Sequence, residues 1–180
     1  MRTFRPAPPV LGLILALLPQ GVSAYPEGAP WGAADRAETD HCASCHWERS
    51  PQYSSASITL AGLPDKATTS QRYSLILSLK DSAMKISGFQ VIAIADGQPA
   101  GQFIVAAQSK LETAALGTMV RSTAPAAALA ERVRWRFQWH APSLLRSPIV
   151  FLIAVSAAND DGSPFGDTIH YRRIEVPVAH

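Results

Sequence analysis

Apolar and polar residues alternate most regularly in the segment from Glu131 to Trp139. Apolar side chains occupy every second position, and charged or polar side chains occupy the positions between them. Successive side chains of a β-strand point to opposite faces, so this alternation predicts a strand with one buried and one exposed face. The apolar positions are Val133, Trp135, Phe137 and Trp139, and the polar positions are Arg132, Arg134, Arg136 and Gln138.

Shorter patterns of the same kind continue along the chain. Tyr73–Lys80 alternates like Glu131–Trp139, whereas Phe89–Ala95 carries apolar residues on both faces, which is typical of a central strand. Asp96-Gly97 predicts a hairpin turn into a strand at Gln102–Ala107. The other predicted strands are Ser57–Ala61, Gly117–Ser122, Ile149–Ser156 and Thr168–Val178.

This succession of strands predicts the fold class. Seven or eight strands with turn signals every eight to twelve residues favour an all-β protein, an antiparallel β-sandwich. The 14 prolines and 11 glycines agree with many turns. Only Leu111–Leu129 has a helix-like composition, because it is rich in alanine, and Pro125 interrupts it.

Residues 1–24 have the composition of a cleaved secretory signal peptide. Arg2 and Arg5 precede the nine-residue apolar run Val10–Leu18, and Val22-Ser23-Ala24 has the small residues of a cleavage site. The longest later apolar run, Ile149–Val155, has seven residues. Because a membrane-spanning helix needs about 20 apolar residues, we expect no membrane span in the mature chain, and a periplasmic or secreted location.

Removal of this leader changes the charge of the chain. The full sequence has 16 basic and 14 acidic residues, and the leader contains two of the arginines and no acid. The mature chain is therefore neutral when its histidines are neutral. Because nucleic-acid binding needs a concentrated excess of basic residues, we expect no nucleic acid as partner.

The two cysteines lie in the sequence Cys42-Ala43-Ser44-Cys45-His46, a C-x-x-C-H motif. This spacing is typical of covalent c-type haem. Each sulfur can form a thioether with one vinyl group of the porphyrin, and the histidine that follows can bind the iron as proximal ligand. We therefore predict one haem c, bound by Cys42 and Cys45, with His46 on the iron.

Three other interpretations of the motif stay open. Cys42 and Cys45 can form a disulfide or a redox pair, although a thioredoxin-like pair belongs to a βαβ context that this chain lacks. Zinc could be bound by His41, Cys42, Cys45 and His46, but these lie closer together than zinc ligands usually do. The two thiols can also be free by chance.

A second axial ligand for the iron has to come from elsewhere in the chain. Met84 lies in a predicted loop before a strand, and His140 ends the alternating strand. We take these two as the candidate distal ligands. His170 is a weaker candidate, which we expect on a solvated strand face. An iron without a distal protein ligand also remains possible.

Weaker signals lie elsewhere. The loop 159–167 contains Asn159, Asp160, Asp161 and Asp167 and could hold calcium, but turn formation explains the same residues. Trp31 and Trp47 could cover a haem, and the arginines at 132, 134 and 136 could meet haem propionates or an acidic partner, although a solvated face is the simpler interpretation. No nucleophile motif supports a hydrolase, and we expect an electron carrier rather than an enzyme.

Several motifs follow one another along the chain in a characteristic order and spacing. They are Gly28–His46, Ile58–Pro64, Gln71–Tyr73, Gly88–Gln90, Ala100–Phe103, Trp135–Pro142, Ala157–Gly162 and Gly166–Ile169. Together they resemble the reeler-like, choice-of-anchor V-type β-sandwich domains of bacterial extracellular proteins. The resemblance implies an immunoglobulin-like fold over Gly28–Val178 and no single activity. His140 stands where the family pattern has a small polar residue, which adds to its candidacy as a ligand.

The sequence thus predicts three parts: the leader 1–24, a haem-binding segment 25–55 and a β-sandwich 56–180. The expected function is single-electron transfer to a redox partner protein by an exported monohaem c-type cytochrome. One alternative is an extracellular binding or structural module with a Cys42–Cys45 disulfide. The other is a haem sensor or haem enzyme with an open iron position.

Overall fold

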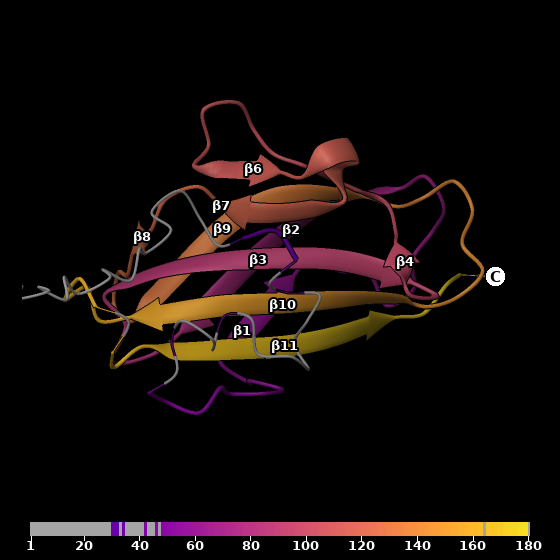
Figure 1. The fold of residues 1–180 in the computed structure, drawn as a ribbon. Helices are drawn as coiled ribbons and strands as arrows, with labels where there is room; N and C mark the ends of the chain where they lie inside the picture. Colours follow the sequence, from indigo (N-terminus) through magenta and orange to yellow (C-terminus); the bar gives the residue numbers. More distant parts are fainter. Residues whose placement is uncertain are drawn as a thin grey trace, which may run out of the picture.

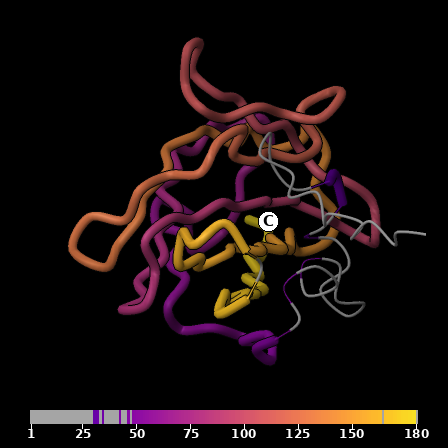
Figure 2. The backbone as a smooth tube through the Cα atoms, turned by 60° about the vertical axis from the view of Figure 1, so that its left-hand side comes forward, coloured from indigo at the N-terminus to yellow at the C-terminus, as the bar shows by residue number. Residues whose placement is uncertain are grey.

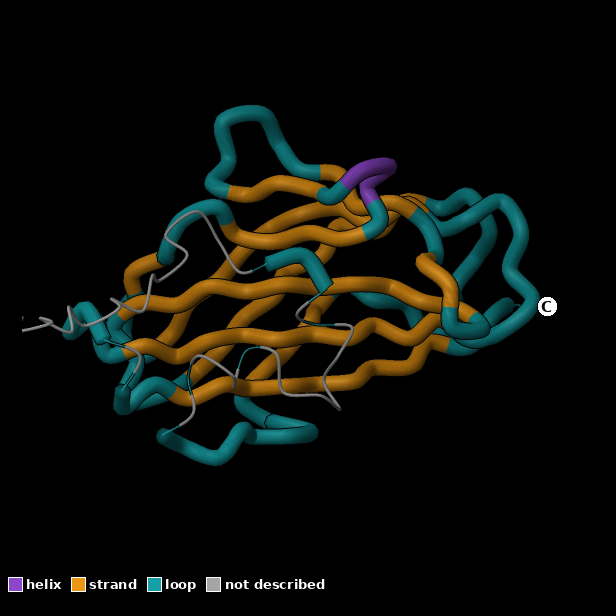
Figure 3. The backbone as a smooth tube through the Cα atoms, viewed as in Figure 1, coloured by secondary structure: helices purple, strands orange, loops and turns teal. Residues whose placement is uncertain are grey.

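The computed structural model describes residues 30–32, 34, 42, 46, 48–163 and 165–179. The predicted leader and most of the predicted haem-binding segment therefore lie outside the described residues. Within them, eleven β-strands and one short 3-10 helix (η1, Ala115–Gly117; purple in Figure 3) follow one another. No helix of the described residues has the length and apolar character that a membrane-spanning helix needs.

The strands form two antiparallel sheets that lie one behind the other, with β1, β2 and β9 behind β3 and β10 in Figure 1. The four-stranded sheet has the order β1-β2-β9-β5, and the seven-stranded sheet has the order β11-β10-β3-β7-β6, with β4 and β8 also paired to β3. The four-stranded sheet consists of β1 (Ile58–Ala61), β2 (Arg72–Lys80), β5 (Gln102–Ile104) and β9 (Arg132–His140). The seven-stranded sheet consists of β3 (Ile86–Ala95), β4 (Gln98–Pro99), β6 (Leu111–Thr113), β7 (Met119–Ser122), β8 (Ala126–Ala127), β10 (Ile149–Ala158) and β11 (Thr168–Val176).

The main core fills the space between the sheets and follows from the alternation of the sequence. Trp139 of β9 packs against Phe151 of β10 with ring centroids 5.0 Å apart, and Phe89 of β3 packs against Trp135 at 4.6 Å. The predicted all-β sandwich is therefore confirmed, as is the strand at Glu131–Trp139 with its apolar side inward. The strands beyond the predicted seven or eight are the short β4, β6 and β8.

The helix-like composition of Leu111–Leu129 produces only one 3-10 turn, and the strand predicted at Gly117–Ser122 is present as β7. This stretch contains β6, the 3-10 turn, β7 and β8, and β7 pairs with both β3 and β6. The preference of alanine for helices is worth less than 1 kcal/mol per residue, so pairing with the edge of a sheet overrides it.

The hairpin turn at Asp96-Gly97 is present, but its second strand is not the predicted one. The short β4 pairs with the end of β3, and Gln102–Ile104 then crosses to the other sheet and pairs with β9. Gly101 makes this crossing possible: it has φ +74°, and a Cβ there would lie 2.4 Å from the His140 carbonyl oxygen. Only glycine accepts both conditions.

Candidate functional site

The outer face of the seven-stranded sheet is apolar and carries the described part of the N-terminal segment. A second apolar cluster lies here, on the far side of the sheet from the main core. This is why β3 and β10 have apolar residues on both faces. The buried members are Ala34, Ile92, Ala154, Ile169 and Tyr171, and the partly buried members are Cys42, Ile94, Met119 and Leu152.

One buried glutamine fixes the segment to this face. Gln90 is 1% exposed, and its side chain accepts a hydrogen bond from the Ala34 backbone N–H (3.0 Å) and donates one to the Pro30 carbonyl (3.0 Å). The guanidinium of Arg121 lies 4.3 Å from the centre of the Trp31 ring. Because the oxygen and the nitrogen of the buried Gln90 amide are both hydrogen-bonded to the segment, they fix its position on the sheet.

The C-x-x-C-H motif begins where the segment reaches β11. The His46 backbone N–H donates to the Cys42 carbonyl at 3.1 Å, so the first and last residues of the motif are joined directly. Cys45 lies outside the described residues, as do His41 and Trp47, so the structure leaves the disulfide and zinc interpretations untested.

The imidazole of His46 is held by a buried carboxylate. Its Nδ1 lies 2.8 Å from Oδ2 of Asp167, whose side chain is 3% exposed, whereas the His46 side chain is 31% exposed. The other oxygen of Asp167 accepts a hydrogen bond from the Asn159 backbone N–H. Metal-binding histidines commonly use one ring nitrogen for a carboxylate and the other for the metal. The contact with Asp167 involves Nδ1, so Nε2 is the ring nitrogen that does not take part in it.

Tyr171 brings a buried polar group to the same place. It is 2% exposed, and its hydroxyl lies close enough to Cys42 for a hydrogen bond. Burial raises the pKa of Tyr171, and the neighbouring Cys42 thiol raises it further. The ring of Tyr53 stacks on it with centroids 5.4 Å apart. Cys42 thus lies against the apolar outer face of the seven-stranded sheet, beside Tyr171.

The two candidate distal ligands are not brought to this place. Met84 is 5% exposed and belongs to the main core between the sheets. His140 pairs with the first residue of β2, and its Nε2 lies 3.0 Å from the Ser70 carbonyl oxygen. Asp167 precedes the start of β11, at the opposite end of the sandwich, so His46 and His140 are separated by roughly the length of a strand, about 25 Å. The distal ligand stays a prediction.

The arginines at 132, 134 and 136 are also far from the motif. They lie on the outer face of the four-stranded sheet, whereas Cys42 lies on the outer face of the other sheet. The structure therefore does not bring them near a haem attached at Cys42. Trp31 is 39% exposed and contacts Arg121 on β7.

A buried polar group that no sequence pattern indicates joins the two sheets at one edge. The Ser55 hydroxyl lies 2.9 Å from Nδ1 of His170, and Asp81 lies 3.2 Å from its Nε2. His170 is 4% exposed, so the expectation of a solvated histidine is wrong. Burial lowers the pKa of His170, although the nearby carboxylate of Asp81 acts in the opposite direction. The three residues come from distant parts of the chain, so no local pattern reveals the group.

This serine, histidine and aspartate link separate segments of the chain. Both ring nitrogens are occupied inside the sandwich, and Ser55 also receives a hydrogen bond from the Ser57 backbone. Next to the group, the segment at Gln52 pairs in parallel with β11. The cluster therefore ties the strand entering the sandwich and the β2–β3 loop to β11.

The loop Asn159–Asp167 is shaped by its own side chains. Asp161 accepts hydrogen bonds from Ser163 and Asn159, and the bonds from Ser163 lower the pKa of its carboxyl group. Asp167 is used by Asn159 and His46. Among the described residues no group of three or more His, Cys, Asp or Glu side chains could hold a metal ion.

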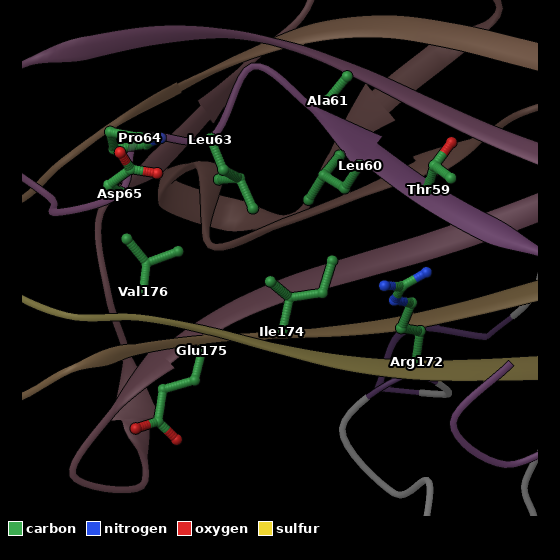
Figure 4. Close-up of a pocket in the computed structure, with 10 residues that line it drawn as sticks. All are labelled: Thr59, Leu60, Ala61, Leu63, Pro64, Asp65, Arg172, Ile174, Glu175 and Val176. Carbon is green, nitrogen blue, oxygen red and sulfur yellow. The ribbon is translucent and has the colours of Figure 1, made fainter. Parts of the chain in front are cut away.

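A shallow groove of about 440 Å³ opens between β1 and β11. Figure 4 shows the side chains of Leu60 on β1 and Ile174 on β11 inside it, and Asp65 in the loop at one end. Arg172 donates to the Ile58 carbonyl across this edge. Asp65, Arg172 and Glu175 are the titratable residues that line the groove, and they do not form a cluster typical of a catalytic site.

Comparisons with known proteins identify the fold only. No protein-family model matches the chain, and no curated protein is similar to it. Among solved structures, the Reelin-N domain of F-spondin is 16% identical with a TM-score of 0.55, and the match covers 77% of this chain and 98% of that one. A human F-spondin reeler domain (fragment 2) is 18% identical with a TM-score of 0.51, over 72% of this chain and 96% of that one. The chain thus has a reeler-like β-sandwich fold.

Proposed function

We propose that the protein is an exported β-sandwich that carries one haem c on Cys42 and Cys45 and transfers single electrons. The observation that carries this proposal is the contact between His46 and Asp167. A histidine directly after a C-x-x-C spacing has its Nδ1 on a buried carboxylate, which is how proteins orient a histidine toward a metal ion. When bound, the haem would accept and release one electron.

The chain's own residues would set the properties of this site. Cys42 and Cys45 would hold the haem, and His46 would bind its iron. Asp167 would fix the plane of the imidazole and increase its electron donation, which favours the oxidised iron. The half-buried Ile94, Met119 and Leu152 on the sheet would offer apolar surface to keep water away.

The test is expression of the mature chain together with machinery for c-type haem attachment. We expect a mass increase of one haem and a Soret absorption band, and we expect the Cys42→Ala/Cys45→Ala double variant to lose both. A protein of unmodified mass without a Soret band would refute the haem proposal.

The role of Asp167 can be tested in the haem-loaded protein. Asp167→Asn should raise the reduction potential, because the amide donates less electron density through His46, while the haem mass stays unchanged. Asp161→Asn, in the same loop but without a contact to His46, is the matched control. Equal potentials in the two variants would remove Asp167 from the site.

The sixth position on the iron distinguishes an electron carrier from a haem sensor or enzyme. If Met84 or His140 is the distal ligand, its replacement by alanine should change the low-spin spectrum. Rapid binding of carbon monoxide by the reduced protein would instead indicate an open position. We propose transfer to a redox partner protein outside the cytoplasm.

A second candidate function is a haem-free extracellular binding or structural module. The similarity in fold to reeler domains supports this candidate directly, because it concerns the β-sandwich and not the C-x-x-C-H motif. In this case Cys42 and Cys45 would form a disulfide. A mass two hydrogens below that of the reduced chain, with no haem bound, would support it.

A further inference from the structure

The four-stranded sheet has a strongly basic outer face. Its four strands contain five Arg or Lys residues and no Asp or Glu. All five occupy outward positions on the two central strands, and four of them are exposed while Arg132 is half-buried. These residues are Arg72 and Lys80 on β2 and Arg132, Arg134 and Arg136 on β9. We call Lys80, Arg132, Arg134 and Arg136 the basic strip.

No carboxylate within the described residues pairs with the basic strip. The ion pairs among the described residues involve cations outside the strip, namely Arg121, Arg173 and two histidines. Glu131 precedes the strip in the sequence but forms no ion pair with it. Asp81 follows Lys80, and its carboxylate contacts His170.

The strip carries a cost for the fold. Lys80 and Arg132 are direct cross-strand partners, and Arg134 lies opposite Ser78. Like charges directly opposite each other in an antiparallel pair destabilise it. The chain is neutral without its leader, so its cations could have been paired with its acids. Unpaired cations concentrated on one face are the arrangement that an anionic ligand would stabilise.

The shape of the strip indicates what kind of anion fits. The charges lie on two adjacent strands, and the flanking strands β1 and β5 contain none. Arg132, Arg134 and Arg136 repeat every second residue, about 6.8 Å apart along β9. An extended polypeptide has this same repeat for side chains on one face. Carboxylates at alternate positions of an acidic segment would therefore stay in register with the three guanidinium groups.

We propose that the basic strip binds an extended acidic segment of a partner protein, with Asp or Glu at every second position. Arginine favours this ligand, because its guanidinium group can form two parallel hydrogen bonds with one carboxylate. The strip lies on the opposite side of the sandwich from Cys42 and His46, so this binding is independent of the haem proposal.

The experiment measures binding of a nine-residue peptide of alternating Glu and Thr to the full mature chain. A second peptide has the same composition with its glutamates in one block. We expect the alternating peptide to bind at least five times more tightly than the blocked one, with binding weakening as salt is added. Equal affinities would overturn the proposal, as would tighter binding of a sulfated glycan or of vesicles containing phosphatidylglycerol.

Charge reversals locate the binding on the molecule. Arg134→Glu should weaken binding of the alternating peptide at least tenfold. Lys110→Glu changes the net charge equally but lies next to β6 in the other sheet, so it should leave binding within twofold of the original. Circular dichroism confirms that both variants are folded. Equal losses in the two variants would show that only net charge matters and would overturn the proposal.

Discussion

The two sheets of this protein differ most in their outer faces. The seven-stranded sheet presents Ile92, Ala154 and Tyr171, which are buried beneath the N-terminal segment. The four-stranded sheet presents arginines, and the described part of the N-terminal segment lies on the other side of the molecule (Figure 2). The seven-stranded sheet therefore packs against apolar clusters on both of its faces, whereas the four-stranded sheet does so only on its inner face.

The charges on the two faces differ in the same way. Arg121 on β7 pairs with Glu112 on β6, and Arg173 pairs with Glu175 on β11. The basic strip has no such partners within the described residues. The outer face of the seven-stranded sheet is thus covered by another part of the same chain. The outer face of the four-stranded sheet is exposed, and this is the face to which we assign a partner.

The largest expected effect comes from opening the covered face. Ile92→Ala should destabilise the protein by about 2–4 kcal/mol, because it leaves a cavity between β3 and the N-terminal segment. Ile76→Ala, at an outward position of the four-stranded sheet, should cost about 1 kcal/mol or less, since Ile76 is only partly buried. Urea unfolding measures both. Similar costs would contradict the distinction between the faces.

A smaller effect is expected from the amide that holds the N-terminal segment. Gln90→Ala leaves the Ala34 N–H and the Pro30 carbonyl without this partner, which should cost about 1–3 kcal/mol. It should also speed proteolysis near residue 34. Gln138→Ala on the exposed face is the matched control and should change stability by less than about 0.5 kcal/mol. Unchanged proteolysis would mean that Gln90 does not hold the segment.

Loss of a paired arginine should matter more than loss of an unpaired one. Arg121→Gln removes the ion pair with Glu112 and the contact with Trp31, and we expect a cost of about 1 kcal/mol. Arg134→Gln should be neutral or slightly stabilising, because it relieves repulsion within the basic strip. Thermal unfolding measures the change in stability of each variant. Added salt should reduce the change in both variants, because it screens the attraction at Arg121 and the repulsion at Arg134.

The smallest effect tests the repulsion itself. Arg132→Glu converts the Lys80–Arg132 pair into an attractive one and should stabilise the protein by about 0.2–1 kcal/mol. Arg136→Glu, opposite Ile76, lacks a direct cationic partner and should gain less. Destabilisation by Arg132→Glu would show that the like-charged pair carries no cost.

Local patterns were sufficient to predict most of the sandwich. The strands β2, β9, β10 and β11 follow from alternation and apolar runs, because these patterns match the geometry of a single strand. The composition of Leu111–Leu129 is helix-like, yet its strands β7 and β8 form by pairing with β3. The crossing of Gln102–Ile104 to the second sheet depends on close packing around Trp139, which no local pattern encodes.

The candidate site likewise combines features that the local sequence reveals with contacts between residues far apart in the chain. The C-x-x-C-H motif is visible because its chemistry depends on residues close together in the chain. Asp167 was noted only as a calcium candidate, since its contact with His46 joins residues far apart in sequence. The burial of Met84 likewise depends on how the two sheets pack.

The sequence by itself determined the longer strands and the motif, because both depend on neighbouring residues, and the balance of 14 basic and 14 acidic residues over positions 25–180. Only the tertiary structure decided which face of each sheet is covered, which carboxylate meets His46, and that five cations share one face without an acid. These properties arise from sheet pairing, which places residues side by side regardless of their separation along the chain.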